Sequence, residues 1–288
     1  MENNTCWNRE LIRKRASVRE NNDRIFDLWS TKTTNMNNYL TDLTDNQWQI
    51  IEKFFDCKRK RKYELSNIWD GILYVIKTGC QWRMLPKDFA PWQTVYYYFR
   101  KWKYAGIIEV LLEEVVYKIR ESVNKSPSPT VCIVDSQSAK TTAVGGFAIG
   151  YDAGKKVKGR KRHIVTDTLG NLLAVEVHSA SYADRAKGFD VISLAKDRYN
   201  TIEKVFADGG YTGSLIDKVK QDLNCKLEII KRTDKGFKVL PKRWIVERTL
   251  GWLSNDRRNS KDYEFSPLTS EAIIQLSFIK VALNKLFR

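Results

Sequence analysis

Two aspartates stand directly after short apolar runs, a position from which carboxylates could do metal-assisted chemistry. Asp135 follows the apolar run 131–134, and Asp208 follows the run 205–207. We interpret each run as a buried strand, and neighbouring parallel strands would then place the two acids side by side. Carboxylates in close proximity repel each other, so the pair is stable only with protons or divalent cations between them. Two metal ions held by oxygen ligands suit phosphodiester chemistry, because one activates the attacking oxygen and the other stabilises the leaving oxygen.

A third acid is available on a predicted helix that runs from Lys242 to about Arg257. Glu247 lies on this helix, and Arg243, four residues before it, faces the same side. We interpret Glu247 as a further metal ligand and Arg243 as a phosphate contact, and a plain surface ion pair is the alternative. Asp208 has an alternative as well, since the two glycines that follow it also suit a tight turn.

The segment Gly145–Arg162, between the first two strands predicted in the acid-bearing region, is strongly basic. Placed beside an acid cluster, such a segment would hold a DNA backbone against the metals by charge. A solvated loop is the alternative. The predicted DNA contacts in this segment are Lys155, Lys156, Lys158, Arg160, Lys161 and Arg162.

Several other catalytic designs lack the residues they need. The two histidines, His163 and His178, belong to no HxH or HxxR pattern, which argues against two-histidine nicking enzymes and tyrosine recombinases. The segment Gly150–Lys156 fails as a phosphate-binding loop, because the first glycine position is Ile149 and no Ser or Thr follows the lysine. The five cysteines are isolated and odd in number, so neither a disulfide framework nor a zinc site is indicated.

The bulk composition favours a nucleic-acid partner. The chain has 288 residues, a formal net charge of +16 and a hydrophobic content of 42%. A chain this basic usually has a polyanionic partner, although charge does not separate an enzyme from a binding protein. No apolar run reaches membrane-spanning length and the N-terminus has no apolar signal core. We therefore expect a cytoplasmic, nucleoid-associated protein without a membrane partner.

Four regions are predicted along the chain. Residues 1–38 read as a poorly structured extension, and residues 39–124 as a small all-α, helix-turn-helix-like DNA-binding domain. In its third helix, residues 92–103, Arg100 and Lys103 lie near one face and are the predicted phosphate contacts. The linker 125–129 contains two Ser-Pro steps, which disfavour a helix.

Residues 130–288 are predicted to form an α/β domain, a mixed sheet flanked by helices. The order of its elements fits the ribonuclease-H-like arrangement, with both aspartates at the ends of strands. The strands are expected at 130–134, 161–166, 172–178, 204–207 and 226–230, and the helices at 185–199, 214–223, 242–257 and 268–286.

Several ordered motifs in this sequence resemble the DDE transposases of bacterial insertion sequences. The likeness is greatest to insertion-sequence family five, which is related to family four, and it extends over residues 39–286. The stretches that carry it are 43–48 (LTDNQW), 79–86 (GCQWRMLP), 134–140 (VDSQSAK), 150–156 (GYDAGKK), 158–163 (KGRKRH), 207–211 (ADGGY) and 243–249 (RWIVERT).

The resemblance implies a catalytic triad of Asp135, Asp208 and Glu247 that holds Mg²⁺, with Mn²⁺ able to substitute. It also implies hydrolysis at the ends of a mobile element to free 3′ hydroxyls, which are then joined to target DNA. The partners would be double-stranded DNA, both terminal inverted repeats and target, and a second copy of the chain in a homodimer on DNA. Two alternatives stay open: an inactive or domesticated relative that only binds DNA, and a structure-specific nuclease on the same fold.

Two positions depart from the signature of family four. Leu240 stands where that family has a tyrosine, and Ser254 stands where it has a lysine. The phosphate contacts of those two positions are therefore not carried over. Arg257 or Arg258 is an alternative source of the missing cation.

Overall fold

The computed structural model describes residues 39–55, 60–143, 145–230 and 243–287. The predicted extension 1–38 lies outside the described residues. The helices are α2 (Asp45–Glu52), α3 (Leu65–Thr78), α4 (Trp92–Tyr104), α5 (Ile107–Ser122), α6 (Asp184–Arg198), α7 (Leu215–Leu223), α8 (Arg243–Leu253) and α9 (Pro267–Leu286), with short 3-10 turns η2 (Trp82–Met84), η3 (Gly209–Tyr211) and η4 (Arg257–Asn259). The strands are β1 (Val131–Lys140), β2 (Gly150–Asp152), β3 (Val157–Asp167), β4 (Leu172–Ser179), β5 (Lys204–Ala207) and β6 (Lys226–Ile229).

The N-terminal part is all helical, as predicted, and its helices begin and end at local signals. Thr44 caps α2 in a capping box with Gln47. Gly79 ends α3 with a φ of 70°, a left-handed conformation that favours glycine. α3 begins at Leu65, and Ser66 lies inside the helix. The core between these helices is aromatic, with the rings of Phe55 and Trp102 4.5 Å apart.

A mixed sheet forms the second part of the chain, and β1 lies at its centre. β3 pairs antiparallel with one side of β1, and β5 pairs parallel with the other side. β4 continues the sheet antiparallel to β3, and β6 continues it parallel to β5. Each neighbouring pair among β1, β3 and β4 is antiparallel, whereas β5 and β6 are parallel to β1, which lies in the middle. This is the ribonuclease-H-like order. The predicted fold class is therefore confirmed.

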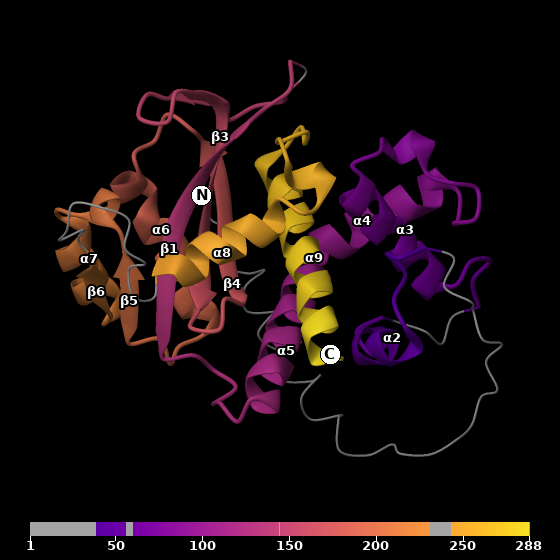
Figure 1. Ribbon diagram of the computed structural model, residues 1–288, viewed down its shortest axis with the longest axis horizontal. Helices are drawn as coiled ribbons and strands as arrows, with labels where there is room; N and C mark the ends of the chain where they lie inside the picture. Colours follow the sequence, from indigo (N-terminus) through magenta and orange to yellow (C-terminus); the bar gives the residue numbers. More distant parts are fainter. Residues whose placement is uncertain (1–38, 56–59, 144, 231–242, 288) are drawn as a thin grey trace.

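Helices cover both faces of this sheet. α6 packs against β3 and β4 and also contacts α7, which packs on β6. On the other face α8 packs against β1 and β3, and α9 packs against β4 and α5. Figure 1 shows α8 crossing β1 and leading towards α9, which stands between the sheet and the helices of the N-terminal part. α8 thus connects the centre of the sheet with the junction between the two parts of the chain.

Three elements differ from the sequence-based expectation. β1 continues past Asp135 to Lys140, and β3 begins at Val157 rather than Lys161. A short strand, β2, was not predicted and pairs with the start of β3. The physical reason is that charged residues fill these strand ends, so their composition is that of a solvated loop. Pairing with neighbouring strands nevertheless satisfies their backbone groups.

The helical part and the sheet share one hydrophobic core. α5 lies against α9 and also contacts β4, although it precedes the Ser-Pro segment in the sequence. Buried side chains from α3, α4 and α5 join those of the sheet in one cluster. The boundary at residues 125–129 stays a prediction, and no separation of the two cores marks it.

Glu271 on α9 binds the backbone of the edge strand β4 and makes the folding stability of the protein depend on pH. Its Oε1 accepts a hydrogen bond of 2.8 Å from the backbone N–H of Val177 on β4. Burial, followed by repulsion from Glu176 and Glu109, raises the pKa of Glu271 to about 7. The folded state therefore binds the proton more tightly than the unfolded chain, and this group reduces stability as pH rises from about 4.5 to about 7.

Replacing Glu271 by glutamine is expected to remove this pH dependence. The amide keeps an acceptor for the Val177 N–H and carries no charge. At pH 8 the variant should be more stable than the wild type by about 1–3 kcal/mol, because each unit of raised pKa is worth about 1.4 kcal/mol. Below about pH 4.5 the difference should disappear. Urea unfolding at both pH values measures it, and a difference independent of pH would contradict the assignment.

Candidate active site

Asp135 and Asp208 lie level with each other on neighbouring strands. In the parallel pair of β1 and β5, Val131 is opposite Lys204, an offset of 73 positions (204 − 131). The same offset carries Asp135 to Asp208, which follows the last residue of β5. Adjacent strands lie about 4.8 Å apart, so the two carboxylates face the same small volume. Asp135 stands in the middle of β1 rather than at its end, because the strand continues beyond it.

Glu247 reaches the same region from α8, and Arg243 connects it with Asp208. The Arg243 Nη2 atom lies 3.1 Å from Glu247 Oε1 and 3.8 Å from Asp208 Oδ2. Both acids therefore share one guanidinium, and the predicted i, i+4 pair on this helix forms. The three acids and the arginine thus gather where β1, β5 and α8 meet.

A fourth carboxylate, Asp184, holds the other side of this centre. Asp184 is the first residue of α6, and its Oδ1 accepts from Ser136 Oγ at 2.9 Å. The same oxygen lies 2.9 Å from Lys161 Nζ and 3.3 Å from His163 Nε2. Ser136 in turn donates its backbone N–H to Asp135 Oδ1 at 2.7 Å. Asp184 therefore links α6 and β3 to the residue next to Asp135.

Sequence reasoning did not single out Asp184, Ser136 or the site position of His163. Three strands, β2, β3 and β4, separate Asp184 from Asp135 in the sequence, and nothing local distinguishes Asp184 from an ordinary acid at a helix start. The available signal was the pattern of alternation. Strand partners point to the same face of a sheet, and Ser136 is paired with His163 in the register of β1 and β3.

The pKa values of the two half-buried acids Asp135 and Asp184 are shifted in opposite directions. Burial, with a further contribution from Asp208, raises the pKa of Asp135 to about 6, although the Ser136 N–H, Arg243 and Lys155 act in the opposite direction. Burial also opposes ionisation of Asp184, but hydrogen bonds from His163, Lys161 and Ser136 outweigh it and lower the pKa of that carboxyl. Asp184 is thus a fixed anion, whereas Asp135 is an acid that a nearby cation would ionise.

Three of the predicted DNA contacts are exposed, and one of them lies beside Asp135. Lys155 is exposed, and its Nζ donates to the backbone oxygen of Ser136 at 3.0 Å, directly beside Asp135. Lys156 and Lys158 are exposed as well, and with Lys140 they line a pocket of about 450 Å³. The turn between β2 and β3 and the start of β3 therefore present three exposed cations, of which Lys155 lies next to Asp135.

The other three basic residues of this segment require a correction, because they are buried in β3. Alternation along the strand sends Arg160 and Arg162 to one face and Lys161 to the other. Arg160 forms an ion pair of 3.0 Å with Asp262, and neither side chain is exposed. Arg162 donates to the backbone oxygens of Asn259 and Lys261. These side chains have no surface on which to meet a DNA backbone, and they hold the protein together instead.

The two predicted contacts on α4 lie away from the acids. Arg100 is exposed, with its guanidinium 5.8 Å from the ring centre of Tyr104. Lys103 is half-buried and donates to Thr269 Oγ1 on α9 at 2.9 Å. Arg100 is therefore accessible to a ligand, whereas Lys103 connects α4 with the catalytic part of the chain.

Comparison with known proteins assigns the family. The family model "Transposase DDE domain" matches residues 126–279, which is more than half of the chain. The chain belongs to the transposase DDE domain family. A second model, "Putative transposase of IS4/5 family", matches residues 43–112. The resemblance inferred from the sequence motifs is thereby confirmed.

One curated relative and one solved structure illustrate this likeness. The "Putative transposase for insertion sequence element IS402" of Burkholderia cepacia is 30% identical over 138 residues, which are 45% of this chain and 65% of that protein. The Mos1 transposase paired-end complex with left transposon end matches over 60% of each chain at 14% identity, with a TM-score of 0.23.

The residues of this DDE domain fit a divalent cation by their chemistry. Asp135, Asp208 and Glu247 offer only carboxylate oxygens, the ligands that Mg²⁺ prefers. Within the described ranges, no three His, Cys, Asp or Glu side chains are already arranged as a metal site. Arg243 instead neutralises Asp208 and Glu247, and Asp135 has a raised pKa. A cation between the carboxylates would replace the guanidinium and relieve the cost of ionising Asp135.

Of the two positions that depart from the family-four signature, the structure describes Ser254. Leu240 lies outside the described residues, and Ser254 is exposed just after α8. Arg258 is engaged by Glu264, with Nε 2.6 Å from Oε1, and Arg257 is exposed. Arg257 is therefore the more accessible of the two arginines considered as a substitute.

Among the described helices, none is both long and apolar enough to cross a membrane.

Proposed function

We propose that this chain is an insertion-sequence transposase that cuts and joins DNA with Asp135, Asp208 and Glu247. The observation that carries the proposal is the shared offset of the β1 and β5 pair, which sets Asp135 level with Asp208. Mg²⁺ bound by these acids would activate the attacking oxygen and stabilise the leaving oxygen of a phosphodiester. Water attacks first and frees a 3′ hydroxyl, and that hydroxyl then attacks a target phosphodiester, so each step forms one P–O bond and breaks another.

The chain's own residues would position the DNA for this reaction. Lys155, Lys156 and Lys158 are exposed, with Lys155 beside Ser136, and would neutralise backbone phosphates. Arg243 would contact the phosphate at the reacting position once a cation takes over its two carboxylate partners. Arg100 on α4 is the contact proposed for the helical part. The DNA would carry terminal inverted repeats, and two copies of the chain would pair two ends.

The test is to map DNA breaks made by the purified full chain. A fragment that carries the DNA flanking this gene is incubated with Mg²⁺ and, in parallel, with a chelator. We expect breaks at the boundaries of short inverted repeats, only with the metal, followed by joining to a second DNA. Binding without breaks would favour a DNA-binding relative. Breaks set by DNA shape, without joining, would favour a structure-specific nuclease.

Asp184 is expected to act by positioning Asp135 rather than by touching DNA. Replacing Asp184 by asparagine weakens the acceptor for Lys161 and His163 and loosens Ser136, which fixes Asp135. Loss of such a supporting contact typically costs 10- to 100-fold, so we expect cleavage to fall by about that factor. The Mg²⁺ concentration for half-maximal cleavage should rise as well.

The matched control for this prediction is Asp190→Asn. Asp190 is an exposed acid on the same helix and is paired with Lys187 at 2.7 Å. Its substitution removes the same charge without touching the site, so cleavage and metal requirement should stay near wild type. Equal behaviour of the two variants would show that Asp184 has no special role.

A further inference from the structure

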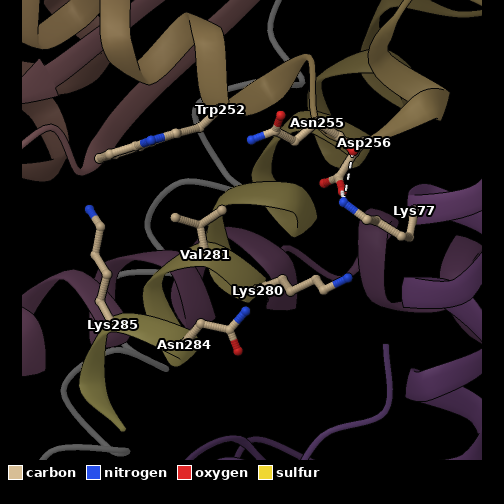
Figure 2. Close-up of a pocket in the computed structure, with 8 residues that line it drawn as sticks. All are labelled: Lys77, Trp252, Asn255, Asp256, Lys280, Val281, Asn284 and Lys285. Carbon is tan, nitrogen blue, oxygen red and sulfur yellow. Dashed lines mark hydrogen bonds and ion pairs between the residues drawn. The ribbon is translucent and has the colours of Figure 1, made fainter. Parts of the chain in front are cut away.

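A pocket of about 380 Å³ lies where α3, α8 and α9 meet, away from the acids. Figure 2 shows Lys280 extending towards Lys77, whereas Lys285 extends towards Trp252 on the other side of Val281. We call it the lysine pocket, and its polar and aromatic lining includes Lys77, Lys280, Lys285, Trp252, Asn255 and Asn284. Asp256 also lines it, so three lysines face one carboxylate there. The pocket is therefore suited to an anion.

The three lysines are not equally occupied by protein partners. Lys77 donates to the backbone oxygen of Asn255 at 2.8 Å and lies 3.6 Å from Asp256 Oδ1. Lys285 donates to Asn171 Oδ1 at 3.2 Å. Lys280 has no hydrogen bond or ion pair within the part of the chain that the structure describes. Burial lowers the pKa of Lys280, although the charge of Asp256 acts in the opposite direction. Among the described residues, no carboxylate forms an ion pair with this half-buried ammonium.

A row of aromatic and cationic side chains leads from the acids to this pocket along α8. The Arg248 guanidinium lies 4.5 Å from the ring centre of Trp244 and 4.7 Å from that of Trp252. Lys285 Nζ lies 4.3 Å from the Trp252 ring on the far side of the row. Glu247 precedes Trp252 by five residues, about 8 Å along a helix axis. A strand that follows α8 from Glu247 would therefore pass the Trp252 side of the pocket.

The pocket also offers an amide donor. Asn284 Oδ1 accepts from Gln47 Nε2 at 2.9 Å, which leaves the amide nitrogen of Asn284 as its donor group. An ammonium and an amide N–H lie at one pocket, beside the exposed Trp244 and Arg248 and the half-buried Trp252. These groups match the contacts that proteins make to a nucleic-acid backbone.

We propose that the lysine pocket binds a backbone phosphate of the DNA strand that runs along α8, with Lys280 as its central contact. This extends the proposed function to a site that contains none of the catalytic acids. The phosphate would become the partner of Lys280, and the amide of Asn284 would be its second contact.

The test compares Lys280→Met with Lys220→Met in the full chain. Lys220 is an exposed lysine on α7, so its replacement removes the same charge away from the pocket. Binding of a labelled duplex with the gene-flanking sequence is measured in chelator, where no cutting occurs, between about 50 and 200 mM salt. We expect Lys280→Met to weaken binding about 3- to 10-fold and to reduce the salt exponent by about 0.9, whereas Lys220→Met changes neither. Thermal unfolding of Lys280→Met should stay at or above the wild-type temperature.

Three outcomes would overturn the proposal: equal effects of the two substitutions, no effect of Lys280→Met on binding, or a wild-type chain that does not bind the duplex. A separate measurement adds inorganic phosphate to the wild type and to Lys280→Met at matched ionic strength. Protection from unfolding by phosphate that is lost in Lys280→Met, with unchanged DNA binding, would assign the pocket to a free anion instead. If the wild type fails to cut with Mg²⁺ but Lys280→Met still weakens binding, the proposed reaction fails and the pocket stands.

Discussion

Replacement of Asp208 by asparagine is expected to abolish DNA cleavage and to leave DNA binding nearly unchanged. Asparagine has the same shape and still offers an Oδ1 acceptor for the Gly210 N–H, a contact of 2.8 Å in the wild type. It removes the negative charge that a cation between Asp135 and Asp208 needs. Loss of one preorganised electrostatic group at a reacting centre costs about 100- to 1,000-fold, so cleavage should fall at least that far.

The measurement is cleavage of the gene-flanking fragment with Mg²⁺, beside a binding titration of the same DNA in chelator. Asp217→Asn is the matched control, because Asp217 is an exposed acid on α7 and lies outside the site. A second readout is the titration of Asp135. Since Asp208 contributes to the raised pKa of Asp135, that pKa should decrease in the variant. Full activity of Asp208→Asn would remove the basis for the proposed reaction.

The positions of the acids were predictable because the runs before them are short, apolar and bounded. Val205, Phe206 and Ala207 are all buried, and the strand they form ends where the sequence predicts. The parallel pairing of β1 and β5 then follows from the ribonuclease-H-like order, which the sequence of elements indicates. The register of the β1 and β5 pair sets Asp135 level with Asp208. This register cannot be inferred from either run of residues alone.

The sequence was least informative where charged residues are buried. Gly159, Arg160, Lys161 and Arg162 have the composition of a solvated loop, yet they belong to the first half of β3. Their partners are distant in the sequence, since Arg160 meets Asp262 and Lys161 meets Asp184. Burial of a charge depends on such a partner, and composition gives no sign of one that lies 100 residues away.

Arg160 provides the sharpest contrast between the loop interpretation and the structure. Its guanidinium donates to Asp262 Oδ1 at 3.0 Å, to Ser270 Oγ at 3.3 Å and to the backbone oxygen of Glu264 at 2.7 Å. It also donates to the backbone oxygens of Phe147 and Phe265. Replacing Arg160 by methionine would leave Asp262 buried without its cation. Breaking a buried pair in this way costs about 3–5 kcal/mol, so we expect a loss of folding stability of that size.

Lys158→Met is the control, because Lys158 lies two residues earlier on β3, carries the same charge and is exposed. Its substitution should change stability by less than about 0.5 kcal/mol, as surface changes usually do, and should weaken DNA binding instead. Denaturant unfolding and DNA titration of both variants separate the two interpretations. If Arg160 were a loop contact to DNA, Arg160→Met would keep its stability and lose affinity, and the assignment of Arg160 to the core would be wrong. Because Asp262 and three backbone oxygens depend on one guanidinium, we expect the opposite order, with stability lost at Arg160 and affinity lost at Lys158.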